Sequence, residues 1–277
     1  MVLPTFLICG AHKAGTTALH KFLDQHPDVL MSDPKETDFF GSHYNKGWEW
    51  FASHFENYDG EEAVGEASSM TMASVKAPGR IAERLPDAKL LFLLRNPIER
   101  AYSHYHYHLY TGKAKTPTSF SEVIRDEENA FRNEIIRLGR YDWQIPRFDE
   151  HFSRDQMKII LQEDLREEPE SVVRDVCRFI GVEPTFAPST ETHNATKNPV
   201  LPGLYYWVRR AWQPVKSIGE SVFPEGIDAL RQGARQLLTT QDRPEMTPED
   251  RTYLRRVYED TISWTEQRLG HALPHWK

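Results

Sequence analysis

Cysteine is scarce in this chain of 277 residues, which contains only Cys9 and Cys177. Two cysteines do not make a disulfide framework, and neither stands at a spacing typical of metal ligands. Cys9 lies in an apolar run and Cys177 in an amphipathic pattern, so we expect both thiols to be buried. Free, buried thiols suit a reducing compartment, and we therefore expect a cytoplasmic protein.

Long apolar runs and an excess of basic residues are also lacking. No stretch approaches the roughly 20 apolar residues of a membrane span, and the N-terminus lacks the basic pattern of a signal peptide. The 34 Lys and Arg residues are outnumbered by 41 Asp and Glu residues, which gives a net charge of −7. We therefore expect no transmembrane segment and no nucleic-acid partner, and any anion site must be a local group of basic residues.

An apolar run and a loop bounded by glycines stand near the start of the chain. Residues 5–9 are typical of a strand buried on both faces, and the loop from Gly10 to Gly15 follows. Thr16 and Thr17 then open a helical pattern. A loop that leads into a helix N-terminus favours anion binding, because N–H groups and the helix dipole point toward it.

This loop resembles the P-loop of triphosphate-binding proteins, G-x-x-x-x-G-K-[ST], but differs at one position. The glycine spacing matches, whereas Thr16 occupies the lysine position and the lysine lies inside the loop as Lys13. A lysine so placed should serve an anion shorter than a triphosphate, close to the loop backbone. The alternative interpretation is a plain strand–turn–helix junction with an exposed lysine.

A second apolar strand, at residues 89–95, ends in Arg95. P-loop enzymes usually have an aspartate here that helps to hold Mg²⁺. Arginine binds phosphate through two hydrogen bonds and cannot hold a cation. Ser103 follows about two helical turns later and is a second donor candidate for the same phosphate. The pair favours a phosphorylated ligand bound without an obligatory metal, although an arginine that only caps the strand is the alternative.

Three histidines, His104, His106 and His108, follow on the same predicted helix. In a helix His104 and His108 share a face, and His106 does not. Because the sequence shows no third ligand beside them, we predict no metal site.

A charged loop, with Lys35, Glu36 and Asp38 ahead of Phe39 and Phe40, follows another short strand. Ligands of open α/β sheets bind at the carboxyl ends of the strands. We therefore expect both phenylalanines to be buried and the charges to line the rim of a cleft. A solvated turn is the alternative.

Strand and helix patterns alternate across residues 5–181, which predicts an α/β fold. We expect a P-loop-like fold of three layers, in which helices flank a central, mainly parallel sheet. We expect a single domain over residues 1–277, with the α/β core at 5–181 and a loop and helical C-terminal part at 182–277. The predicted elements are strands at 5–9, 28–31, 63–67, 89–95 and 156–162, helices at 16–26, 78–85, 97–108, 120–137, 168–180, 204–240 and 247–270, and a loop at 182–203.

The chain resembles sulfotransferases that use 3′-phosphoadenosine 5′-phosphosulfate (PAPS), and in particular the heparan-sulfate-type and bacterial branch. The resemblance covers most of the chain. It rests on residues 10–17, residues 35–40, the strand end Arg95-Asn96-Pro97 with Arg100 and Ser103, the turn at residues 139–141, and the C-terminal pattern of Leu254, Tyr258, Leu269, Gly270 and Trp276.

The resemblance implies that a sulfuryl group moves from PAPS to a hydroxyl or amine of a small-molecule or glycan acceptor. It implies catalytic roles for Glu36, as general base, and for Lys13. The donor-binding residues that it implies are Lys13, Ala14, Gly15, Thr16 and Thr17 for the 5′-phosphosulfate, and Arg95 and Ser103 for the 3′-phosphate. Lys197, in the predicted loop, is a further candidate over a phosphate. The candidate acceptor contacts are Lys35, Asp38, His43 and Tyr141.

Two positions depart from the heparan-type pattern. Asp38 stands where those relatives often have histidine, and Ala67 stands where they often have lysine. Loss of the lysine favours a smaller or neutral acceptor over an anionic polysaccharide, and Asp38 or His43 are alternative bases. Two other functions stay open, namely a kinase that uses ATP and a nucleotide-binding module without catalysis, which would not need Glu36.

Overall fold

The computed structural model describes residues 1–111, 119–185, 188–189, 198–199, 239–240 and 245–277. The chain divides into two compact units. The first unit comprises Met1–Arg100, Ile136–Glu191 and Arg255–Lys277, and the second comprises Ala101–Ile135 and Thr192–Leu254. The expected single domain, with its internal boundary at residue 181, stays a prediction.

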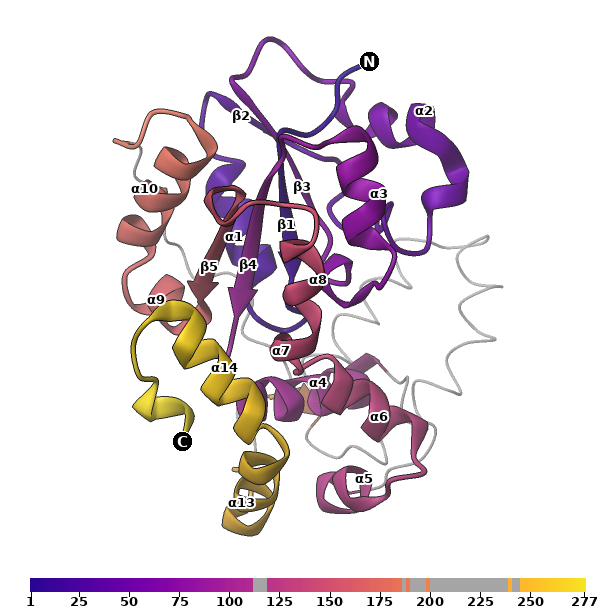
Figure 1. Cartoon of the computed structure of the whole chain (residues 1–277), viewed down its shortest axis with the longest axis vertical. Coiled ribbons are helices and arrows are strands. Elements are labelled where there is room, and N and C mark those ends of the chain that lie inside the picture. Colours follow the sequence, from indigo (N-terminus) through magenta and orange to yellow (C-terminus); the bar gives the residue numbers. More distant parts are fainter. Residues whose placement is uncertain (112–118, 186–187, 190–197, 200–238, 241–244) are drawn as a thin grey trace. The chain divides into compact units, whose positions relative to one another are not determined.

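In the described residues, the first unit is built on a five-stranded sheet with the strand order β2-β3-β1-β4-β5 (Figure 1). All four strand pairs are parallel, and Leu7 of the central strand lies between Glu66 and Leu90. The strands are β1 (Phe6–Gly10), β2 (Val29–Met31), β3 (Ala63–Ala67), β4 (Lys89–Leu94) and β5 (Met157–Leu161). The predicted parallel α/β sheet is confirmed.

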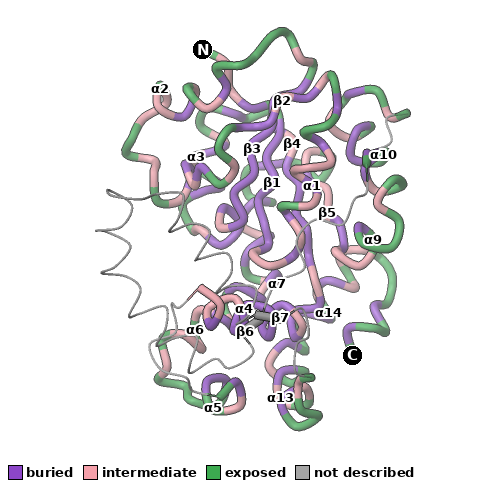
Figure 2. The backbone as a smooth tube through the Cα atoms, turned by 180° about the vertical axis from the view of Figure 1, so that it is seen from behind, coloured by how far each residue is buried: buried purple, intermediate pink, exposed green. Residues whose placement is uncertain are grey.

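Burial explains why the strands could be read from the sequence. Every residue of β1 and β3 is buried, and so is every residue of β4 after Lys89 (Figure 2). Strands covered on both faces are apolar along their whole length, which is the pattern that residues 5–9 and 89–95 show. Phe92 of β4 packs edge-to-face on Phe148, with 5.0 Å between the ring centroids.

Helices lie on both faces of the sheet, which confirms the layered fold. Figure 1 shows α3 and α8 in front of the sheet and α1 behind it, and α10 packs against α1. The helices of the first unit include α1 (Thr16–Leu23), α2 (Gly47–Ala52), α3 (Ala77–Arg84), α7 (Tyr141–Gln144), α8 (Pro146–Asp149), α9 (Gln162–Glu167), α10 (Pro169–Ile180) and α14 (Glu259–Leu269). The short 3₁₀ turns are Tyr44–Lys46, Ser53–Phe55, Thr71–Ala73, Arg154–Gln156 and Pro274–Trp276.

The second unit is mostly helical where it is described. Its described elements are the helix α5 (Phe120–Arg125) and an antiparallel pair of two-residue strands, β6 (Asn198–Pro199) and β7 (Thr239–Thr240). Parts of α4 (Pro97–Thr111), α6 (Ala130–Arg137) and α13 (Pro248–Val257) also belong to it, since these helices run across the division. Thr239 and Thr240 were predicted to be helical and Asn198 and Pro199 to lie in a loop, so both predictions are wrong there. The rest of the predicted 204–240 helix, at residues 204–238, and most of the 182–203 loop lie outside the described residues.

The single helix predicted at 120–137 is wrong, because the chain forms α5 and then α6. The Asn129 side chain explains the break. Its Oδ1 accepts hydrogen bonds from the N–H groups of Phe131 (2.9 Å) and Arg132 (3.3 Å). A side chain that caps backbone donors in this way starts a new helix.

The last predicted helix, at 247–270, is also interrupted, at Tyr258 between α13 and α14. Tyr258 is fully buried, and its ring lies so close to Gly139 that an added Cβ there would stand 2.8 Å from it. The interruption thus coincides with a contact between segments far apart in the sequence. In the described part of the chain, no helix has the length and apolar character needed to cross a bilayer.

Candidate active site

The carboxyl ends of three neighbouring strands bring together the predicted phosphate-binding segments and the two serines that follow β3. The strands β3, β1 and β4 are adjacent in the sheet, and all run in the same direction. Ser68 and Ser69 follow β3, the loop of residues 11–15 follows β1, and Arg95 follows β4. These segments therefore leave the sheet at one edge, which is where α/β folds bind ligands.

The loop after β1 has the geometry of an anion cradle. Gly10 has a φ of 140°, and a Cβ added to it would lie 2.8 Å from the Ser69 carbonyl oxygen, so only glycine fits. Gly15 is the N-cap of α1, with a φ of 97°. The N–H groups of Ala18 and Leu19 both donate to the Gly15 carbonyl, at 2.9 and 3.2 Å. The N–H groups of residues 15–17 therefore precede the first intrahelical bonds and face the open end of the helix.

Lys13 and Arg95 are neighbours in this cradle. Nη1 of Arg95 donates to the Lys13 carbonyl oxygen at 3.3 Å, which joins the β1 loop to the end of β4. Tyr141, which is fully buried, donates its hydroxyl to the Arg95 carbonyl at 2.8 Å. Lys13 has a φ of 70°, a conformation that non-glycine residues seldom adopt and that often marks functional loops. The Arg95 guanidinium is thus bound to the backbone of the loop that carries Lys13, the other cation predicted to bind a phosphate group.

Glu36 is fixed against the end of β3. Its N–H donates to the Ala67 carbonyl at 3.0 Å, and its φ is 68°. Its Oε2 accepts hydrogen bonds from the N–H (2.9 Å) and the hydroxyl (3.1 Å) of Ser69, and its Oε1 from Nζ of Lys35. The side chain is nevertheless 41% exposed. A carboxylate that is held this firmly and still reaches solvent is suited to take a proton from a bound substrate.

A buried carboxyl group, that of Glu66 in β3, supports the Glu36 loop from beneath. Its Oε1 accepts hydrogen bonds from the Thr37 hydroxyl (2.7 Å) and from the Ser68 hydroxyl. The Ser68 Oγ in turn accepts from the N–H of Asp38 at 2.8 Å. Glu66 therefore anchors the loop directly through Thr37, and through Ser68 it also anchors Asp38.

Burial raises the pKa of Glu66 to about 7; the hydrogen bonds from Ser68 and Thr37 oppose this rise, and the charge of Glu36 adds to it. The folded protein thus holds the Glu66 proton more tightly than the unfolded chain, whose carboxyl has the ordinary value of 4.5. The contribution of this proton to the free energy of unfolding is fully present below pH 4.5 and is lost as the pH rises through about 7.

We expect Glu66→Gln to flatten the pH dependence of stability while the hydrogen bonds to the side-chain oxygen remain. Relative to this variant, the free energy of unfolding of the wild type should fall by about 2 kcal/mol between pH 5.5 and pH 8.5. Urea unfolding at both pH values measures it, and Glu49→Gln, which replaces an exposed carboxyl, is the control. Parallel curves for the wild type and Glu66→Gln would show that Glu66 does not titrate in this range.

The two alternative bases lie on the same loop as Glu36. Asp38 has a φ of 47°, and its Oδ2 accepts from the Ser42 N–H at 3.2 Å. Nδ1 of His43 lies 2.7 Å from the Thr37 carbonyl oxygen. Because a carbonyl only accepts, Nδ1 carries the hydrogen, and Nε2 is the basic nitrogen. Both side chains are partly exposed on the loop that carries Glu36, so both stay candidates.

The remaining predicted residues have varied outcomes. Phe39 and Phe40 are fully buried, as expected; Phe39 stacks on Phe51, and Phe40 stands edge-to-face to Trp48. Lys35 pairs with Glu36. Tyr141 was predicted to contact the acceptor, but its burial beneath Arg95 suits a support for that residue instead.

Two predicted donor contacts stay predictions. Ser103 is buried in α4, but it belongs to the second unit, whereas Arg95 belongs to the first. Lys197 lies outside the described residues.

Sequence reasoning missed the roles of Glu66, Ser68 and Ser69. The available signal was a carboxyl group in the middle of an otherwise apolar strand, followed directly by two hydroxyl side chains. A buried carboxyl needs such partners.

Comparison with known proteins assigns these motifs to one family. Residues 3–266 match the family described as "Sulfotransferase domain". The chain is 31% identical to bifunctional heparan sulfate N-deacetylase/N-sulfotransferase 4 of Mus musculus, over 294 residues, and 30% identical to form 3 of the Homo sapiens enzyme. Each match covers 99% of this chain but 31% of the relative. The chain thus spans about a third of the length of these curated relatives.

Solved structures agree on the fold. A sulfotransferase from Alicyclobacillus acidocaldarius superimposes with a TM-score of 0.74 at 26% identity, and the match covers 100% of this chain and 99% of that one. The sulfotransferase domain from the curacin biosynthetic pathway matches with a TM-score of 0.50 at 14% identity, over 68% of this chain and 77% of that one. The second match supports the fold alone.

Proposed function

Since the chain belongs to the sulfotransferase domain family, we propose that it transfers a sulfuryl group from PAPS to a hydroxyl or amine and releases adenosine 3′,5′-bisphosphate (PAP). The observation that carries the proposal is the joined pair of Lys13, inside the loop after β1, and Arg95, at the end of β4. A triphosphate site carries a lysine and an aspartate in these two segments, whereas this chain carries two cations. It disfavours the alternative of a kinase that needs ATP and Mg²⁺.

The proposed donor site uses groups of the β1 loop and of α1. Lys13 and the N–H groups of residues 14–17 bind the 5′-phosphosulfate, since they offer one full positive charge and several backbone donors at a helix N-terminus. Arg95 binds the 3′-phosphate, and Ser103 and Lys197 stay sequence-based candidates for the same phosphate. These residues supply the anion contacts without a metal ion.

The proposed chemistry is an in-line displacement at sulfur. Glu36 accepts the proton of the acceptor hydroxyl or amine as the new bond to sulfur forms. Lys13 neutralises the charge that grows on the phosphate oxygen as its bond to sulfur breaks. The hydrogen bonds that hold Glu36 and the β1 loop keep both groups in position, and positioning is a major part of catalysis in such transfers.

For the acceptor, we propose a small or uncharged molecule, such as a neutral glycan hydroxyl. The relatives named above act on heparan sulfate by name. In this chain the position after Glu66 is Ala67, a buried residue without charge. The rim near Glu36 offers Lys35, Asp38 and His43 for acceptor contacts. A cytoplasmic location is part of the proposal and is supported by Cys9 and Cys177, which are both free and buried.

A donor-labelled screen tests the proposed function. Purified protein is incubated with PAPS labelled in its sulfate group and with sets of neutral sugars, small alcohols, amines and heparan fragments. We expect labelled product in at least one neutral set. If no set yields product although PAP binds, the chain is a nucleotide-binding module and the proposed activity is wrong.

A further inference from the structure

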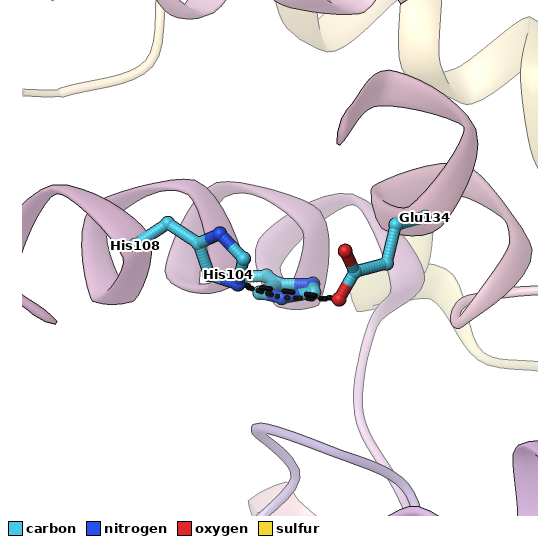
Figure 3. Close-up of side chains that lie close together, drawn as sticks. All are labelled: His104, His108 and Glu134. Atoms are coloured by element: carbon cyan, nitrogen blue, oxygen red, sulfur yellow. Dashed lines mark hydrogen bonds and ion pairs between the residues drawn. The ribbon is translucent and has the colours of Figure 1, made fainter. Parts of the chain in front are cut away.

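Three potential metal ligands meet in the second unit, on α4 and α6 (Figure 3). They are Nε2 of His104, Nε2 of His108 and a carboxylate oxygen of Glu134. The two nitrogens are 3.0 Å apart, and Oε1 of Glu134 lies 3.6 Å from that of His104 and 4.0 Å from that of His108. Glu134 is the third ligand that the sequence did not reveal, since it comes from a different helix.

The separations suit a single small cation. Two ligands about 2.0–2.1 Å from one zinc ion at the tetrahedral angle lie about 3.3 Å apart. The three observed separations, from 3.0 to 4.0 Å, bracket that value. The histidines are spaced i, i+4 on one helix, as in many zinc sites. Little movement would therefore bring all three atoms to coordination distance.

The packing around the cluster fixes the two imidazole rings. His108 stacks on Phe131, with 4.4 Å between the ring centroids and an angle of 16° between the planes. His104 is fully buried and stands edge-to-face to His108 at 4.6 Å. Phe131 lies one turn before Glu134 on α6, so the same packing holds the rings and brings the carboxylate toward them. A preorganised donor set loses little conformational entropy when it binds an ion.

The proton balance of the cluster also favours a cation. Two Nε2 atoms at 3.0 Å can share only one hydrogen in a good hydrogen bond, and both face the carboxylate. A divalent ion would replace that hydrogen, bind both neutral rings and be half neutralised by Glu134. The cluster is open enough for an ion to enter, because the Glu134 side chain is 42% exposed and that of His108 12%.

We propose that His104, His108 and Glu134 bind one divalent transition-metal ion, and zinc best, because two imidazoles and one carboxylate are ligands that zinc prefers. The ion would join α4 to α6 and stabilise the second unit, with water at its fourth position. The proposal is independent of the sulfuryl transfer, because none of the three residues belongs to the proposed donor site or acceptor rim.

Zinc titration of tag-free protein tests the proposal. After treatment with a chelator and removal of the chelator, the protein is titrated with Zn²⁺ in a calorimeter, and its thermal unfolding is followed with and without zinc. We expect one ion per chain and a higher melting temperature in zinc. Glu134→Gln and His108→Ala should each weaken zinc binding about 100-fold or more, since even residues that only orient a ligand contribute 10–100-fold.

Glu128→Gln is the matched control, because it makes the same substitution at an exposed glutamate of the second unit. It should bind zinc as the wild type does. Glu134→Gln keeps the shape of a partly exposed side chain, so its fold should persist, and circular dichroism checks this. A wild type that binds no zinc, or two ligand variants that bind it as tightly as the wild type, would overturn the proposal and leave the cluster as a hydrogen-bonded histidine pair.

Discussion

Substituting Glu36 with glutamine lowers kcat about 100-fold or more and changes the affinity for PAP by less than about twofold. The reason is that the amide keeps the size of the side chain and an oxygen for the Ser69 hydrogen bonds but cannot accept a proton. Glu36 is not among the proposed donor contacts, so donor binding should be unaffected. Initial rates of labelled transfer and calorimetric titration with PAP measure the two effects.

Glu49→Gln is the control for this substitution, because Glu49 is an exposed carboxyl of α2. It should leave both values unchanged. If Glu36→Gln retains the wild-type rate, the general base is one of the other two groups of the loop. Asp38→Asn and His43→Gln then identify it, and asparagine tolerates the left-handed backbone found at Asp38.

Replacing Lys13 with methionine should lower kcat by about 10²–10³-fold, the typical cost of removing one group that stabilises charge in the transition state. PAP binding should weaken about tenfold, because a charged hydrogen-bond partner of the 5′-phosphate is lost. The loss in kcat exceeds the loss in binding because the charge on the leaving oxygen grows only as the reaction proceeds. Methionine preserves the unbranched side chain, so the left-handed loop should keep its conformation.

Lys21→Met, on the same helix-loop segment, is the control for the general loss of a positive charge and should behave as the wild type. Steady-state kinetics and PAP titrations of the two variants give the comparison. Equal loss of kcat in Lys13→Met and Lys21→Met, or no loss in either, would contradict the role assigned to Lys13.

Much of the fold could be predicted because the central strands are buried on both faces. The apolar runs that became β1 and β4 need no partner to be recognised, and the glycine-bounded loop between β1 and α1 is a local pattern. The positions of Lys13 and Arg95 followed from the same local reasoning. The structure adds the 3.3 Å contact that brings them together.

Three of the features that sequence reasoning missed involve contact between distant segments. Tyr258, at which the last predicted helix is interrupted, packs its ring against Gly139. Glu66 supports the Glu36 loop through Thr37, which is 29 residues away in the sequence. Glu134 joins two histidines that the helical pattern already paired, but it does so from another helix. None of these pairs leaves a periodic signal in the sequence.

The cradle at the ends of β1 and β4 should bind PAP-type nucleotides in preference to ATP. Calorimetric titration of the wild type with PAP and with ATP, each with and without Mg²⁺, measures this preference. We expect PAP to bind with the same affinity in both conditions and at least about tenfold more tightly than ATP, a difference of about 1.4 kcal/mol or more. A preference for ATP, or binding of PAP only in the presence of Mg²⁺, would contradict it.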